Sequence, residues 1–238
     1  MLVCQYCGEA LGWAVAYCPF CGKPKPAAVV KPKRSPPPAP PARARASAPA
    51  EPAVVILTKG QNVSLSRLAP NVQCILIDQG WDRRTAAGVD MDLDEILFMT
   101  AADGKVRGDE DLVFYNQPRS ACGAIELIGS KEKGEKFTVK LDRIPDAIQR
   151  LVVGVTIYDD AVRVRNFGQV RGAYIRIIDP ASALELVRFA LPEEYSTETA
   201  MIFGEIYRRQ GEWKLKAVGQ GFSGGLRALC GQFGVSVA

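Results

Sequence analysis

Histidine is absent from the 238-residue sequence. This absence excludes Ser-His-Asp and Cys-His catalysis, zinc sites with histidine ligands, and histidine-based pH switches within the chain. Long apolar runs are also absent, because no stretch reaches the roughly 18 residues of a membrane-spanning helix. The first residues, Met-Leu-Val-Cys, lack the basic and apolar segments of a signal peptide, so we expect a cytoplasmic protein.

Acidic residues are scarce in only one part of the chain. Residues 23–52 contain seven Lys or Arg and one acidic residue, whereas residues 54–238 contain 23 basic and 24 acidic residues. The net charge of +4 therefore arises from the segment 23–52, and a hydrophobic fraction of 47% is ordinary for a protein with a sizeable core. The length and this unevenness favour a medium-sized domain preceded by a small module and a basic connector.

Four of the seven cysteines stand in two copies of one pattern, Cys4-Gln-Tyr-Cys7-Gly and Cys18-Pro-Phe-Cys21-Gly. Each Cys-x-x-Cys turn can direct two thiolates to one point, and the following glycine permits the tight turn. Four thiolates leave no position for water, which favours a structural zinc site. The alternative, a thioredoxin-like redox pair, lacks a surrounding βαβ pattern.

Residues 1–23 are therefore predicted to form a zinc ribbon. A module this short cannot fold on apolar burial alone, so the zinc ion would supply its folding free energy. We expect a small aromatic core from Tyr6, Trp13, Tyr17 and Phe20. The module resembles the minimal zinc ribbons at the N-termini of many bacterial proteins, which implies interaction with a protein partner rather than chemistry.

The connector, residues 24–53, is rich in proline and alanine. It contains ten of the sixteen prolines, and Pro-Pro-Pro-Ala-Pro-Pro at 36–41 is typical of a disordered, extended spacer. Its spaced Lys and Arg residues allow weak attraction to nucleic acid or anionic lipid. It offers no aromatic stacking platform, which favours a solubilising tether over a nucleic-acid anchor.

Two acidic clusters lie about twenty residues apart. The first is Asp90-Met-Asp92-Leu-Asp94, whose carboxylates would share one face of a strand, and the second contains Asp109 and Asp111. Oxygen ligands in this number suit Ca²⁺ better than Zn²⁺. Solvated acidic loops are the alternative, but apolar residues beside both clusters tie them to buried strands and favour a metal site.

The remaining sequence predicts a mainly β domain over residues 54–238, a two-sheet β-sandwich with a few short helices. A helix is expected at Pro145–Leu151, and a second one where Leu226, Leu229, Cys230 and Phe233 recur at helical spacing before Gly234. Runs with alternating or continuous apolar residues predict strands at Val72–Asp78, Ile96–Thr100, Leu112–Tyr115, Ala124–Leu127, Lys136–Leu141, Arg150–Tyr158, Ala173–Ile178, Glu185–Ala190, Ala200–Arg208 and Trp213–Val218.

Residues 54–238 resemble a TerD-family domain, the tellurium-resistance and stress-protein family. The resemblance runs in order through nearly the whole domain. It includes Gly80-Trp-Asp82, Asp90-Met-Asp-Leu-Asp94, Gly108-Asp-Glu-Asp111, Phe203-Gly-Glu-Ile-Tyr-Arg208 and Gly219-Gln-Gly-Phe222. It implies a β-sandwich that binds calcium through clustered aspartates, and a role in resistance to tellurite and other stresses without an established catalytic activity.

Matched residue by residue, the resemblance implies seven calcium ligands: Asp82, Asp90, Asp92, Asp109, Asp111, Asn116 and, as a weaker candidate, Glu205. One departure concerns the loop Gly129-Ser-Lys-Glu-Lys-Gly-Glu-Lys136, where family members carry more acidic residues. We therefore expect one calcium ion rather than two.

Two classes of function remain open from the sequence. The first is a calcium-binding stress protein that acts as a binding or scaffold module, with the zinc ribbon recruiting a partner. The second is an enzyme that acts on phosphorylated or nucleotide-like substrates with the metal as Lewis acid. The lack of histidine and of a phosphate-binding loop favours the first, so we expect no enzyme, no catalytic residue and no organic cofactor.

Overall fold

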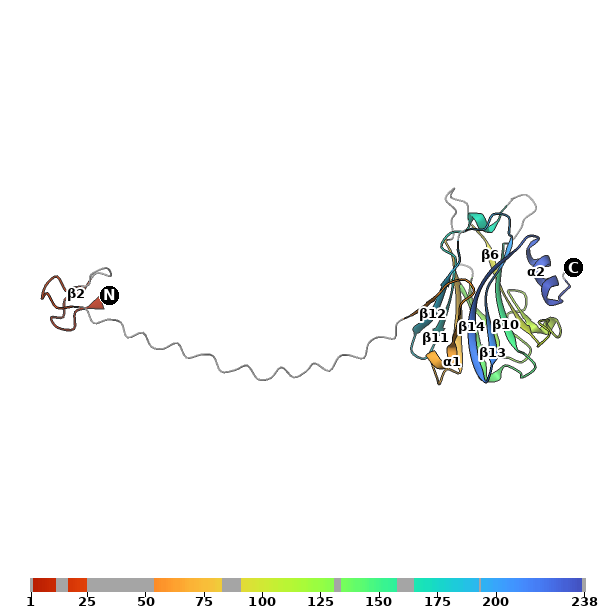
Figure 1. The fold of residues 1–238 in the computed structure, drawn as a ribbon, viewed down its shortest axis with the longest axis horizontal. Coiled ribbons are helices and arrows are strands. Elements are labelled where there is room, and N and C mark those ends of the chain that lie inside the picture. Colours follow the sequence, from red (N-terminus) through yellow and green to blue (C-terminus); the bar gives the residue numbers. More distant parts are fainter. Residues whose placement is uncertain are drawn as a thin grey trace. The chain divides into compact units, whose positions relative to one another are not determined.

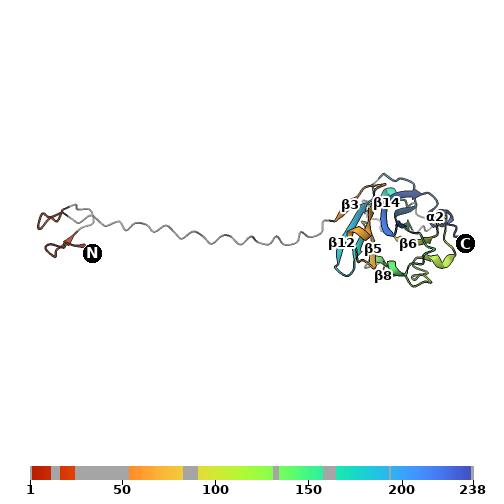
Figure 2. The same ribbon diagram turned by 60° about the horizontal axis from the view of Figure 1, so that its bottom comes forward.

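The computed structural model describes residues 2–11, 17–24, 54–82, 91–130, 134–157, 165–192 and 194–236. The predicted linker, residues 24–53, lies outside these ranges except for Pro24, and so does Trp13. The chain separates into two compact units, Met1–Pro49 and Ala50–Ala238. Figures 1 and 2 show the small N-terminal unit and the β-rich C-terminal unit.

The N-terminal unit is built from two short hairpin-like turns. Strand β1 (Leu2–Val3) pairs antiparallel with β2 (Ala10–Leu11), and an isolated bridge joins Tyr17 and Pro24. Each pairing flanks one Cys-x-x-Cys turn, so the two turns have the same local backbone arrangement.

The C-terminal unit contains, within the residues described, two six-stranded sheets packed face to face (Figure 1). The β5 sheet has the order β3-β12-β11-β5-β9-β8 and the β6 sheet the order β4-β14-β13-β10-β6-β7. The strands are β3 (Val55–Leu57), β4 (Asn62–Ser64), β5 (Cys74–Gly80), β6 (Leu93–Thr100), β7 (Leu112–Val113), β8 (Ile125–Ser130), β9 (Gly134–Lys140), β10 (Arg150–Ile157), β11 (Tyr174–Asp179), β12 (Leu184–Ala190), β13 (Ala200–Arg209) and β14 (Glu212–Phe222).

The main core lies between the two sheets, because alternate residues of each strand point inward. In β5 these are Ile75 and Ile77, and in β9 Phe137 and Val139, all without exposed surface. Burying a Phe or Ile side chain contributes ~1.5–3 kcal/mol relative to leaving it in water. This inter-sheet packing fixes which residues of each strand face the interior.

A second, smaller core covers the outer face of the β6 sheet. Helix α2 (Gly225–Phe233) packs there, and the ring centroids of Phe98 and Phe233 are 4.5 Å apart. Gly234 ends the helix with φ +83°, a left-handed conformation that glycine adopts without steric cost. Strand β6 is therefore buried on both faces, which explains its apolar run Ile96–Met99.

The predicted fold class is confirmed, since the domain is mainly β with two sheets and few helices. The predicted helix over Pro145–Leu151 is wrong: Ile148 closes a single turn onto the Pro145 carbonyl, and Arg150 already begins β10. The β-branched run after Arg150 pairs with strands on both sides, which outweighs a weak helical start. Sequence reasoning did not foresee β3, β4 and the short helix α1 (Leu65–Leu68).

Three short 3₁₀ segments complete the elements described: η1 (Asp109–Asp111), η2 (Leu141–Arg143) and η3 (Phe167–Gln169). Among the helices described, none has the length and apolar character needed to cross a bilayer.

Candidate metal centres

The four cysteines of the N-terminal unit converge on one point. Their Sγ atoms all lie within 4.8 Å of one another, with 3.7 Å between Cys4 and Cys21 and 3.6 Å between Cys7 and Cys18. Four sulfurs at ~2.3 Å from a zinc ion would be about 3.8 Å apart, whereas a disulfide requires ~2.05 Å. The donor set and its spacing fit tetrahedral zinc.

The two halves of this centre repeat with an offset of fourteen residues. The Cys4 N–H donates to Glu9 O and the Gly8 N–H to Cys4 O, both at 2.8 Å. The same bonds recur in the second half, from Cys18 N–H to Lys23 O at 2.9 Å and from Gly22 N–H to Cys18 O at 2.8 Å. Gly8 and Gly22 adopt φ +78° and +70°, a conformation that other residues reach only with strain.

The pKa values of two thiols differ in a way that favours the binding of a cation. The Tyr6 N–H lowers the pKa of the Cys4 thiol to about 6, although burial opposes this shift. The Glu9 N–H also lowers the pKa of Cys7, but burial and the neighbouring thiols raise it by more, to about 12. The Cys4 thiolate therefore forms readily, and its negative charge opposes ionisation of the neighbouring thiols. A bound cation would offset this repulsion and favour the thiolate form of all four.

The expected aromatic core of the ribbon does not form. Tyr6, Tyr17 and Phe20 are 54%, 64% and 68% exposed, and Trp13 lies outside the residues described. Only Cys4 and Cys18 make up a buried cluster in the described part of this unit. The sulfurs lie at the centre of the ribbon, and the three described aromatic side chains are left on the surface.

The two acidic clusters of the C-terminal unit lie at opposite ends of β6. Asp92 directly precedes the strand, whereas Asp111 precedes Leu112, which pairs with Phe98. Six residues of extended strand between Asp92 and Phe98 span about 20 Å. The structure therefore does not bring the two predicted groups of ligands together into one calcium site.

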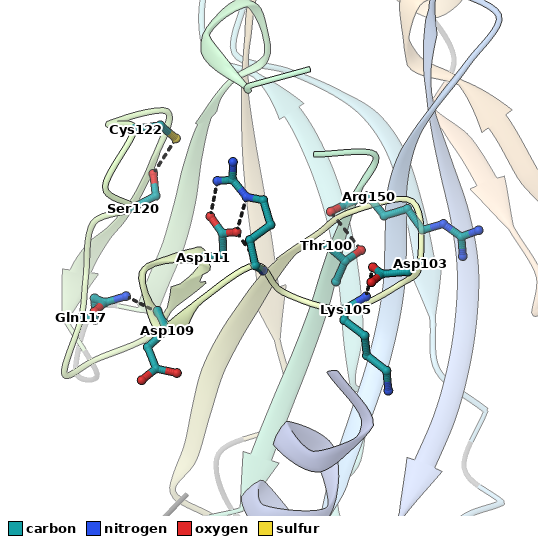
Figure 3. Close-up of polar contacts among 10 residues, drawn as sticks. Thr100, Asp103, Lys105, Asp109, Asp111, Gln117, Ser120, Cys122 and Arg150 are labelled. Atoms are coloured by element: carbon teal, nitrogen blue, oxygen red, sulfur yellow. Dashed lines mark hydrogen bonds and ion pairs between the residues drawn. The ribbon is translucent and has the colours of Figure 1, made fainter. Parts of the chain in front are cut away.

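The second cluster is occupied by contacts within the chain (Figure 3). Asp111 is buried, and its two carboxylate oxygens accept hydrogen bonds of 2.7 Å from Arg107 Nε and Nη2. Asp109 is exposed on η1, and Gln117 Nε2 donates to its backbone carbonyl at 2.8 Å. Asn116 is exposed in the two-residue turn closed by the bridge between Phe114 and Gln117, a position that asparagine favours for conformational reasons.

The other predicted ligands are also dispersed. Glu205 lies on the outer face of the β6 sheet, 3.9 Å from Arg150. Asp82 is exposed just after β5, where its N–H donates to Arg171 O at 2.8 Å, and Asp92 is exposed before β6. Asp90 lies outside the described residues. Among the residues described, only the four cysteines bring three or more metal-binding side chains together.

Two polar residues inside the sandwich were missed by sequence reasoning. Glu95 and Gln79 are only 4% and 5% exposed, and they face inward with Leu97 and Ile77. The signal was present in the sequence, because each occupies the inward position of an alternating or apolar strand. They lie at the end of the sandwich where β5 ends and β6 begins, the end nearest Asp82 and Asp92.

Comparisons with known proteins agree with this architecture. The profile of the TerD domain matches residues 54–233, three quarters of the chain. The chain belongs to the TerD family. Tellurium resistance protein TerD of Serratia marcescens is 45% identical over 190 residues, covering 77% of this chain and 99% of that protein. General stress protein 16U of Bacillus subtilis is 37% identical over 190 residues, covering 77% and 98%.

The fold of the TerD domain is also found in a solved structure. The crystal structure of a homologue of telluride resistance protein (TerD) from Streptomyces coelicolor A3(2) superposes with a TM-score of 0.51 at 23% identity. The match covers 66% of this chain and 94% of that one. At this identity the likeness concerns the fold alone.

Proposed function

We propose that this TerD-family protein acts in the stress response as a calcium-binding scaffold, and that its zinc ribbon recruits a protein partner. Family membership carries the stress-response part, since relatives that match 98–99% of their own length are named for tellurium resistance and general stress. The ribbon lies outside the matched residues 54–233. It is therefore the part of the chain that would bind a partner specific to this protein, whereas the TerD domain is shared with the relatives.

Calcium is assigned to the end of the sandwich near Asp82 and Asp92. Asp82 follows β5 and Asp92 precedes β6, so carboxylates from both sheets come to the same end of the domain. Both are exposed, which suits ligands that must exchange water for a cation. Asp111 is not part of this assignment, because Arg107 already neutralises it.

The partner surface is assigned to the exposed aromatic side chains of the ribbon. Tyr6 and Phe20 occupy equivalent positions in the two halves, one residue before Cys7 and Cys21. Lys23 Nζ lies 4.8 Å from the centroid of the Tyr6 ring, which orders that ring without burying it. Rigid aromatic groups of this kind are enriched at protein interfaces. Because the sulfurs form the centre of the unit, replacing these aromatics should leave the zinc site intact.

Calorimetric titration of Ca²⁺ into the zinc-loaded full chain tests the calcium assignment. We expect Asp92→Asn and Asp82→Asn to weaken binding, and Asp109→Asn, from the other end of β6, to bind as the natural sequence does. Equal binding by all variants would overturn the assignment. Turnover of a phosphorylated substrate that Asp92→Asn abolishes would instead support the metal-dependent enzyme.

Affinity capture with the double variant Tyr6→Ala, Phe20→Ala tests the partner surface. We expect this variant to retain its zinc and to lose proteins that the natural sequence captures. Retention of the same proteins by a variant of unchanged zinc content would show that the ribbon aromatics are not the contact.

A further inference from the structure

The outer face of the β6 sheet is only partly covered by α2. The helix packs on the start of β13, where Ile202 belongs to the second core (Figure 1). Further along β13, Ile206 points into the main core, so its neighbours Glu205 and Tyr207 point outward. This part of the face is open, because Tyr207 is partly exposed and Lys216, which pairs with Glu205, is exposed.

Basic side chains surround Tyr207 on this open face. Tyr207 pairs with Arg150 of β10 on one side and with Lys214 of β14 on the other. Directly paired side chains on one face of an antiparallel sheet have Cβ atoms about 5 Å apart. Lys216 and Arg209 follow two residues further along β14 and β13, and both are exposed. These five residues form the β6-sheet patch.

The cations of the patch are incompletely neutralised. Within the residues that the structure describes, Lys216 and Arg209 form no ion pair. Arg150 Nη1 lies 3.9 Å from Glu205 Oε2, a long distance for an ion pair, and half of the Arg150 side chain is exposed. Salt screens such an exposed pair, so Arg150 keeps most of its attraction for an anion from outside.

The second acidic residue beside the patch is shared between two cations. Glu212 accepts a hydrogen bond of 2.7 Å from Arg67 Nε, whereas Lys214 Nζ lies 3.7 Å from its other oxygen. With Arg67 included, five basic and two acidic side chains lie together here, a net charge of +3. The whole of residues 54–238 contains 23 basic and 24 acidic residues, so this is a local excess of positive charge.

The outer face of the β5 sheet shows the contrast. There Asp78 forms ion pairs with both Arg176 and Lys136, and Glu185 forms ion pairs with both Arg176 and Arg188. The central cations of that face therefore have carboxylate partners within the domain. The two open sheet faces of the sandwich differ in charge, and only the β6-sheet patch has cations left for a partner.

The ring of Tyr207 is also available. Among the described residues no cation lies over it and its hydroxyl group makes no hydrogen bond. The other aromatic rings on the strands are occupied: Arg188 lies 4.6 Å from the Tyr174 centroid, and Arg208 lies 4.7 Å from that of Trp213. A partly exposed ring among cations is the arrangement on which a nucleic-acid base stacks while its phosphates meet the basic side chains.

We propose that the β6-sheet patch binds single-stranded nucleic acid, with one base stacked on Tyr207 and the phosphates held by Arg150, Lys214 and Lys216. A duplex keeps its bases stacked within the helix, so only its phosphates would contact the patch. An acidic peptide would use the cations but has no base for the ring. Binding of this kind is independent of base sequence, because every base has a stacking face. It does not depend on the calcium or ribbon assignments.

Fluorescence anisotropy of a short labelled oligothymidylate, added to the zinc-loaded full chain at several salt concentrations, tests the proposal. We expect Tyr207→Leu to weaken binding at least about fivefold, the lower end for one stacked base, and Tyr207→Phe, which keeps the ring, to bind as the natural sequence does. Lys216→Gln should reduce the slope of log affinity against log salt by about 0.7, the value for one phosphate contact. Lys140→Gln, an equal charge change on the outer face of the β5 sheet, should leave the slope unchanged.

The melting temperature without nucleic acid shows whether each variant is folded, and Lys216→Gln should melt as the natural protein does because Lys216 is exposed. An unchanged salt slope in folded Lys216→Gln would overturn the proposal, as would unchanged affinity in Tyr207→Leu. Loss of binding in Lys31→Gln, Lys33→Gln, with the patch variants unaffected, would move the contact to the linker. Equally tight binding of poly-glutamate that Tyr207→Leu leaves intact would replace the nucleic acid by an acidic protein.

Discussion

Arg107 Nε and Nη2 donate to the two carboxylate oxygens of Asp111, each at 2.7 Å, across four positions of one loop (Figure 3). The Arg107 N–H adds a third hydrogen bond to the same carboxylate at 3.2 Å. This two-pronged contact positions the segment that leads into β7, and it uses the lone pairs that a calcium ion would need.

We therefore predict that Asp111→Asn destabilises the domain by about 2 kcal/mol, the range for a hydrogen bond to a charged group, and leaves Ca²⁺ affinity unchanged. Urea unfolding and calorimetry measure the two effects separately. Asp109→Asn is the control, because Asp109 is exposed and its substitution should change stability by no more than ~0.5 kcal/mol. Loss of calcium binding in Asp111→Asn at unchanged stability would restore Asp111 as a ligand.

Zinc removal should unfold the N-terminal unit alone. In the described part of this unit only Cys4 and Cys18 form a buried cluster, whereas the TerD domain has a large apolar core of its own. We expect one zinc ion per chain by elemental analysis, lost after chelation or in Cys4→Ser, with the main melting transition unchanged. Cys122→Ser, which removes an exposed thiol elsewhere, should retain the ion. More than one zinc, or a lowered main transition on chelation, would contradict this separation.

The three remaining thiols should differ in reactivity. Cys122 is exposed, Cys74 is partly buried with a raised pKa, and burial raises the pKa of Cys230 to about 11. In the zinc-loaded protein, iodoacetamide should label Cys122 first, Cys74 slowly, and Cys230 only on unfolding, because the thiolate is the nucleophile. Mass spectrometry after peptide digestion gives the order, and early labelling of Cys230 would contradict the packing of α2.

The free energy of unfolding should depend on pH through the carboxyl group of Glu185. A hydrogen bond from Arg188, and another from Arg176, lower the pKa of Glu185, although burial opposes the shift. The unfolded chain, with a Glu pKa of ~4.3, then binds more protons than the folded one, so this stabilisation is complete above that pKa and is lost as pH falls through the folded value.

We therefore predict that Glu185→Gln lowers the free energy of unfolding at pH 7. The difference in this free energy between the variant and the natural protein, the gap, should become smaller as the pH falls below about 4. Denaturant unfolding at several pH values measures the gap. Glu126→Gln removes an exposed pair with Arg119 and should show little effect at any pH. A gap of constant size across this range would contradict the predicted shift of the Glu185 pKa.

Features that depend on near neighbours in the chain could be predicted from the sequence. The repeated Cys-x-x-Cys-Gly turns specify the sulfur cluster, because each turn is closed by its own backbone hydrogen bonds. Alternating apolar residues specify most strands, and Gly234 specifies the end of α2. These are local relations that spacing alone reveals.

Which distant groups meet depends on the folding of the whole domain and could not be predicted from local spacing. The acidic residues at 92 and 111 look alike in the sequence, yet the antiparallel pairing of β6 with β7 places them at opposite ends of one strand. The assignment of strands to sheets likewise brings Gln79 of β5 to Gly154 of β10 across the inter-sheet core, where Gln79 Nε2 donates to Gly154 O. Spacing along the chain carries no information about strand order or about which sheet faces which, because packing of the whole inter-sheet core sets both.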